Sequence, residues 1–129
     1  YNFKLFSNNC LGSSVDTYVA SDSFGTAKFK GIKYLDVTTV YSKKDNVVFI
    51  NVINRSEDKK ITTSIISNSG DFSGKAIASI INSDDLKSPF SFDKQSQYLP
   101  VTKEVKVSGN KMLFTFPAHS FTQLRVNVK

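Results

Sequence analysis

The feature that most constrains the fold is the apolar run of residues 46–54, NVVFINVIN. A run this short, rich in Val and Ile and bounded by polar residues, predicts a strand that is buried on both faces. Residues 60–68, KITTSIISN, follow after the polar segment RSEDK and predict the antiparallel partner of that strand in a hairpin. The two runs therefore indicate the central hairpin of an all-β domain, and they name no chemistry.

The rest of the chain adds short strands separated by turns. Apolar and polar residues alternate, or apolar residues gather, over residues 15–20, 32–41, 76–82, 101–107, 112–116 and 123–128. This makes about eight strands, with turns roughly every 8–12 residues, which is typical of an antiparallel sandwich or barrel. Residues 69–74 are expected to form a turn, and residues 83–97 are the longest irregular stretch. No useful helical period follows the first dozen residues, which excludes a parallel βαβ architecture.

Residues 1–9, YNFKLFSNN, are the one plausible helix, because Phe3 and Phe6 share a face at spacing i, i+3. Gly12 is expected to end this helix in the left-handed conformation. The alternative is a first edge strand. So many aromatic residues in one terminal turn are typical of a helix that packs on a partner outside this sequence.

The net charge of +6 would suit a polyanion-binding protein or an ordinary solvated surface. The lysines are spread along the whole chain, and Arg55 and Arg125 are the only arginines, which is poor for bidentate recognition of phosphates or bases. We therefore expect a solvated surface and no nucleic-acid partner. No apolar run approaches the ~20 residues of a membrane span, so no membrane partner is expected either.

Cysteine and histidine are too few to build a reactive centre by themselves. Cys10 is the only cysteine, so no internal disulfide forms and a Cys-rich metal site is excluded. A domain without disulfides fits the cytosol, the periplasm or secretion equally well. His119 is the only histidine and lies in a turn after Pro117. A catalytic triad or a zinc site needs further partners, so we expect a structural or solvent-facing histidine and no metal or cofactor.

Two adjacent pairs of carboxylates stand out, Asp84–Asp85 and Glu57–Asp58. The acid and base of a glycosidase face each other across a cleft at about 5–10 Å, which neighbours in a turn seldom do. We expect both pairs to be solvated loop residues, with Ca²⁺ binding at Asp84 and Asp85 as the alternative. No catalytic residue is therefore expected.

The segment Asn54-Arg55-Ser56 matches the N-glycosylation sequon, a motif that is common by chance. Its predicted place in a hairpin loop would permit modification.

A sugar-binding platform is conceivable but is not the first expectation for the aromatic residues. Tryptophan is absent, which leaves Tyr34, Tyr41, Tyr98, Phe90 and Phe92 as candidates. Phe and Tyr on alternating strands more often belong to a core or an interface.

Several segments, in order along nearly the whole chain, resemble the α-L-arabinofuranosidases of glycoside hydrolase family 51. Residues 117–124 (PAHSFTQL) resemble the closing segment of that family, and residues 52–55 (VINR) and 34–38 (YLDVT) resemble two of its strands. Residues 84–101 resemble the family's irregular connection, but without the Asn expected there. Residues 1–12 resemble the last helix of the family's catalytic barrel.

The resemblance implies two parts. Residues 1–12 would be the remnant of the last helix of a preceding catalytic (β/α)8 barrel, and residues 13–129 would form a C-terminal, jelly-roll-like antiparallel β-sandwich. The family performs retaining hydrolysis of terminal α-L-arabinofuranosyl groups in hemicellulose or arabinan with two barrel glutamates, and neither glutamate has a counterpart here.

The expected function is therefore that of a non-catalytic accessory domain, which supports the barrel and meets polysaccharide through the parent enzyme. The alternatives are a stand-alone carbohydrate-binding module and an Ig-like interaction module. If the barrel normally covers the helix, and a strand from elsewhere completes the sandwich, Phe3 and Phe6 should form an exposed apolar patch and a sheet edge should be open.

Overall fold

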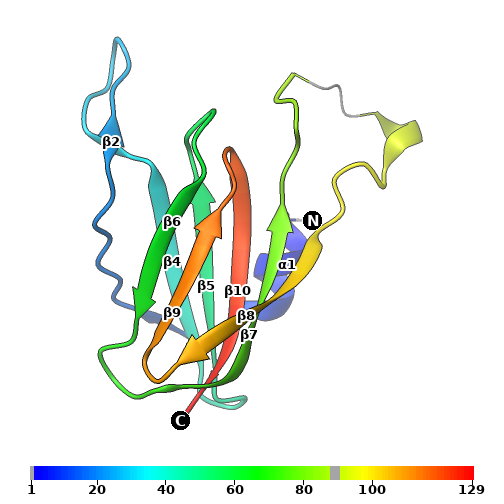
Figure 1. The fold of residues 1–129 in the computed structure, drawn as a ribbon. Coiled ribbons are helices and arrows are strands. Elements are labelled where there is room, and N and C mark those ends of the chain that lie inside the picture. The colour runs from blue at the N-terminus through cyan, green and yellow to red at the C-terminus, as the bar shows by residue number, and fades with distance from the viewer. Residues whose placement is uncertain (1, 88–90) are drawn as a thin grey trace.

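The computed structural model describes residues 2–87 and 91–129, and this part of the chain is an antiparallel all-β fold with one short helix (Figure 1). The elements are α1 (Asn2–Asn9), β1 (Ser13–Val15), β2 (Ser23–Phe24), β3 (Ile32–Lys33), β4 (Leu35–Ser42), β5 (Val47–Asn54), β6 (Ile61–Ile66), β7 (Phe72–Ile81), the 3-10 turn η1 (Phe92–Lys94), β8 (Val101–Ser108), β9 (Lys111–Phe116) and β10 (Ser120–Val128). None of the described helices is long and apolar enough to cross a membrane.

Eight strands form one curled sheet in the order β1-β4-β5-β10-β7-β8-β9-β6, and β2 and β3 make a separate ribbon. The sheet bends at the β8–β9 hairpin, where Val107 pairs with Met112 and Ser108 with Lys111 and the ladder then ends. Beyond this bend, β9 and β6 lie over β4, β5 and β10 (Figure 1). The fold is thus sandwich-like, as predicted.

The predicted hairpin between residues 46–54 and 60–68 is wrong. Strand β5 pairs with β4 on one side and with β10 on the other, so both of its edges are occupied. Strand β6 pairs instead with β9, in a register that sets Ile61 opposite Phe116 and Ile65 opposite Met112. The inward side chains of β6 therefore face the core from the opposite layer.

Strand β5 is nonetheless buried on both faces, as its apolar run predicts. Ile50 and Val52 point into the core, whereas Phe49 and Asn51 are buried on the other face of the sheet. Only Ile53 is more than a third exposed in this strand, at 42%.

Other boundaries differ from the predicted ones. The strand expected over residues 15–20 is not found there: β1 ends at Val15, and residues 16–20 are irregular. Strand β7 begins at Phe72, inside the expected turn. Gly74, with φ +71°, lies opposite the register shift between Arg125 and Asn127, which is why β7 continues through a glycine. The 83–97 stretch holds only η1 among its described residues; Pro89 and Phe90 lie outside them.

Gly12 does not adopt the left-handed conformation that we expected at the end of the helix. A Cβ atom at this position would stand 2.2 Å from the carbonyl oxygen of Tyr41. Glycine is required here because two backbone segments approach closely, and not because of a helix cap.

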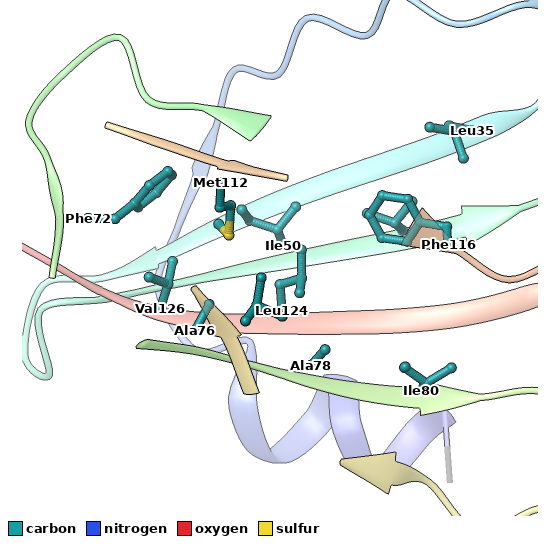
Figure 2. Close-up of a cluster of buried hydrophobic side chains, with 12 residues drawn as sticks. Leu35, Ile50, Phe72, Ala76, Ala78, Ile80, Met112, Phe116, Leu124 and Val126 are labelled. Carbon is teal, nitrogen blue, oxygen red and sulfur yellow. The ribbon is translucent and has the colours of Figure 1, made fainter. Parts of the chain in front are cut away.

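The core lies between the two layers (Figure 2). Leu124 and Val126 of β10 and Ala76 and Ala78 of β7 are essentially inaccessible to solvent. Met112 and Phe116, which belong to β9, reach them from the opposite layer, so one cluster holds both layers together (Figure 2).

Truncation of Leu124 should therefore be costly. We expect Leu124→Ala to lower the free energy of unfolding by about 2–5 kcal/mol, because the side chain is fully buried and its removal leaves a cavity. Leu113→Ala is the matched control, since Leu113 is 60% exposed, and should cost about 0.5 kcal/mol or less. Urea denaturation of the three proteins measures both values, and equal losses would contradict the assigned core.

Candidate functional site

Helix α1 packs on the face of the sheet that points away from the core (Figure 1). The Phe6 ring meets Phe121 of β10, with ring centroids 5.4 Å apart. Phe6 is still 39% exposed, and Phe3 is 91% exposed. The expected apolar patch is therefore present. The sheet also ends in two unpaired edges among the described strands, β1 and β6.

A cluster of side-chain amides fixes the helix to the sheet. The Gln123 amide nitrogen donates to the Asn51 side-chain oxygen at 2.8 Å and to the Leu5 carbonyl at 3.2 Å, and the Gln123 oxygen accepts from the Asn9 amide at 2.8 Å. Gln123 and Asn51 are each only 3% exposed. Buried amides need such partners, so the hydrogen bonds specify one position of the helix.

The sequence analysis missed this amide cluster. Its one signal was Asn51, a polar residue in the middle of the apolar run of β5. Cys10 sits at the rim of the cluster, where its sulfur lies 3.4 Å from the Asn51 amide nitrogen and 3.5 Å from the Gln123 amide nitrogen.

His119 joins two loops through backbone carbonyls. It adopts φ +39°, and its backbone N–H donates to the Ser56 carbonyl at 2.7 Å. Its Nδ1 lies 2.7 Å from the Glu57 carbonyl oxygen, and its Nε2 contacts the Ser83 carbonyl oxygen. Carbonyls only accept hydrogen bonds, so both ring nitrogens donate when the imidazole is protonated. The hydrogen bond to Ser83, and then that to Glu57, raise the pKa of His119 above its ordinary value.

This shift predicts a pH dependence of stability. A group whose pKa is raised on folding stabilises the fold below its unfolded pKa, and that stabilisation is lost as pH rises through the folded pKa. The free energy of unfolding should therefore fall as pH rises above the ordinary histidine pKa of about 6.5 and His119 loses its proton. Urea denaturation at a series of pH values from acid to mildly alkaline measures the fall.

The matched control is His119→Asn, because asparagine tolerates positive φ and does not titrate. The variant should be less stable at low pH and should lose most of the fall in stability that accompanies deprotonation of His119. An unchanged pH dependence in the variant would contradict the role given to the His119 ring.

The sequon residue Asn54 is a buried structural residue, only 1% exposed. Its amide nitrogen contacts the carbonyl oxygens of Lys59 and Pro117, both at 2.8 Å, and of Phe116 at 3.2 Å. Its side-chain oxygen accepts from the Ser56 N–H at 3.0 Å. The folded protein therefore offers no free amide for glycosylation.

The paired carboxylates serve their own loops. Asp85 accepts from the Lys87 N–H at 2.8 Å, and Asp58 accepts from the Ser56 hydroxyl at 3.3 Å. Asp84 and Glu57 add a small favourable charge interaction with protonated His119. Within residues 2–87 and 91–129, no group of three or more acidic, histidine or cysteine side chains is placed to hold a metal ion.

The candidate aromatic residues do not gather into one platform. Tyr34 stacks on Phe24 with centroids 5.0 Å apart, whereas the Tyr41 hydroxyl donates to the Asn46 side chain at 2.8 Å. Tyr34 immediately precedes strand β4, whereas Tyr41 lies near the end of that strand. About 23 Å of extended chain therefore separates the two tyrosines. Phe92, on η1, is 87% exposed. Tyr98 lines a hollow near His119. Phe90 lies outside the described residues.

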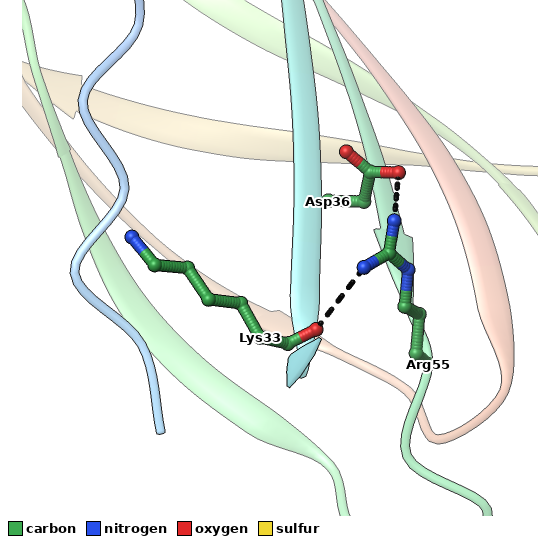
Figure 3. A network of polar contacts seen from close by, with 3 residues as sticks. All are labelled: Lys33, Asp36 and Arg55. Carbon is green, nitrogen blue, oxygen red and sulfur yellow. Dashed lines mark hydrogen bonds and ion pairs between the residues drawn. The ribbon is translucent and has the colours of Figure 1, made fainter. Parts of the chain in front are cut away.

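One larger groove exists elsewhere, between the segment that follows β1, the start of β4 and strand β6. It has a volume of about 780 Å³ and is lined by residues 18–22, 33–35 and 59–63. Beside it, Arg55 pairs with the Asp36 carboxylate and donates to the Lys33 carbonyl at 3.4 Å (Figure 3). Arg55 is thus occupied in holding the ends of β3, β4 and β5 together.

Comparisons with solved structures find proteins of the same fold. No family model matches the chain, and no curated protein does. Among solved structures, a family 51 α-L-arabinofuranosidase from Bifidobacterium longum matches with a TM-score of 0.84 at 16% identity, over 97% of this chain and 25% of that one. The α-L-arabinofuranosidase from Thermotoga maritima, in an arabinose complex, matches with a TM-score of 0.78 at 16% identity, over 93% of this chain and 27% of that one.

A more distant likeness is to a GH30 endoxylanase from Clostridium papyrosolvens, with a TM-score of 0.56 at 16% identity, over 83% of this chain and 22% of that one. The chain spans about a quarter of the length of the arabinofuranosidases that it matches. It has, over nearly its whole length, the fold of one part of the family 51 α-L-arabinofuranosidases, in agreement with the resemblance in its sequence.

Proposed function

We propose that this chain is the non-catalytic accessory β-sandwich of an α-L-arabinofuranosidase that removes terminal α-L-arabinofuranosyl groups from hemicellulose or arabinan. The observation that carries the proposal is the difference between the two coverages: the match spans 97% of this chain but only 25% of the enzyme. The remaining three quarters of such an enzyme would hold the reaction, in a (β/α)8 barrel that precedes this domain.

The positions of the acidic residues favour a non-catalytic role for this chain. Retaining hydrolysis needs two carboxyl groups about 5 Å apart across a bound sugar. The adjacent acidic residues at 57–58 and 84–85 instead accept hydrogen bonds in their own loops or face His119. We therefore assign no catalytic role to any residue of this chain.

The helix gives the proposed contact with the barrel. Its inner side is fixed by the amide cluster, while Phe3 projects into solvent at 91% exposure. On the same face of the sheet, Ile53 and Ile77 are 42% and 38% exposed. Exposed apolar surface of this kind marks an interaction site, so we place residues 1–12 and this face against the barrel.

The direct test is activity on p-nitrophenyl α-L-arabinofuranoside. We expect no hydrolysis by the 129-residue chain, and hydrolysis by a protein that extends it through the coding sequence upstream of Tyr1. The chain mixed with unrelated protein controls for contaminating activity. Hydrolysis by the chain alone, or none by a folded extended protein, would refute the proposal.

A further inference from the structure

The groove described above pairs each of its two tyrosines with a lysine. The Lys33 ammonium lies 5.8 Å from the centroid of the Tyr18 ring, and the Lys59 ammonium lies 5.5 Å from that of Tyr34. Tyr18 is 91% exposed, so its ring also offers a free face to the groove. Tyr34 is half-buried and held by Phe24, which makes it a fixed wall.

The groove has an excess of unpaired positive charge. Lys33, Lys59 and Lys60 line it, against the single acidic residue Asp22. The ion pairs of the described chain are Arg55–Asp36 and Lys75–Glu104, so none of these three lysines is neutralised by a carboxylate. Lys33 is instead positioned by a hydrogen bond from its ammonium to the Val19 carbonyl.

The opposite wall offers hydrogen-bonding groups. Strand β6 is the last strand of the sheet, so the peptide groups on its outer side have no strand partner. Thr62, Thr63 and Ser21 add hydroxyl groups to the lining. The groove thus combines a free aromatic face, polar groups and cations in a volume of about 780 Å³, which suits a small ligand.

We propose that this groove binds an oligosaccharide bearing a uronic acid, with a sugar ring against Tyr18 and its carboxylate at Lys59 and Lys60. An aromatic face suits the C–H face of a pyranose, and ammonium groups suit a carboxylate. The inference rests on the proposed function, because hemicellulose side chains carry such acidic sugars. Nucleic acid is a poorer fit, since the nearby Arg55 is occupied by Asp36 and Lys33.

The test is calorimetric titration of the 129-residue chain with two probes. One is a xylo-oligosaccharide with a glucuronic acid side group, and the other is the same compound after reduction of its carboxyl group to an alcohol. We expect the acidic probe to bind at least about tenfold more tightly than the reduced one. Its affinity should fall as salt is raised, because the lysines are exposed.

Variants locate the site. Tyr18→Ala, and Lys59→Gln combined with Lys60→Gln, should each weaken binding of the acidic probe by about tenfold. Lys103→Gln combined with Lys106→Gln is the matched control, because it removes the same charge from β8, outside the groove, and should change binding by about twofold or less. Circular dichroism of each variant checks that the fold is kept.

The proposal is overturned if both probes bind equally, if the β8 control loses as much affinity as the groove variant, or if the folded chain binds neither probe. It is also overturned if a single-stranded DNA oligonucleotide binds more tightly than the acidic probe. None of these titrations involves the barrel, so their failure would leave the accessory-domain proposal standing, while the activity test above decides that proposal without the groove.

Discussion

The structure depends on the double pairing of β10. This strand is hydrogen-bonded to β5 over residues 120–127 and to β7 over most of the same length, so it sits in the middle of the sheet. It is also buried on both faces, through Leu124 and Val126 in the core and Phe121 and Gln123 under the helix. The last strand of the chain therefore has to be in place before either the core or the helix contact is complete.

The two faces of β10 have different structural roles. The core face is apolar and joins the layers through Met112 and Phe116, which any sequence with suitable volume could supply. The outer face instead carries Gln123, whose amide holds Asn9 and Asn51 together at hydrogen-bonding distance. A buried amide network costs stability if one member is lost, so it specifies orientation more than it adds stability. Under the proposed function, this network would hold the helix that leads from the barrel in one orientation on the sheet.

Local pattern was enough to predict the sandwich, the short helix and most strands. It was not enough to predict strand partners, because a strand's pattern shows which face is apolar but not which edge it meets. The alternation of residues 61–66 suited a hairpin with β5, yet β4 and β10 occupy both edges of β5. The groove was harder still to predict, because Tyr18, Lys33 and Lys59 are far apart in sequence and line one groove only in the folded chain.

The contact that we propose between helix α1, the sheet face beside it and a catalytic barrel can be tested by hydrogen–deuterium exchange. Exchange would be measured on the 129-residue chain and on the chain extended upstream of Tyr1. We expect slower exchange of the backbone amides of α1 (Asn2–Asn9) in the extended protein, with β10 equally protected in both. Unchanged exchange across α1, in an extended protein shown to be folded, would contradict it.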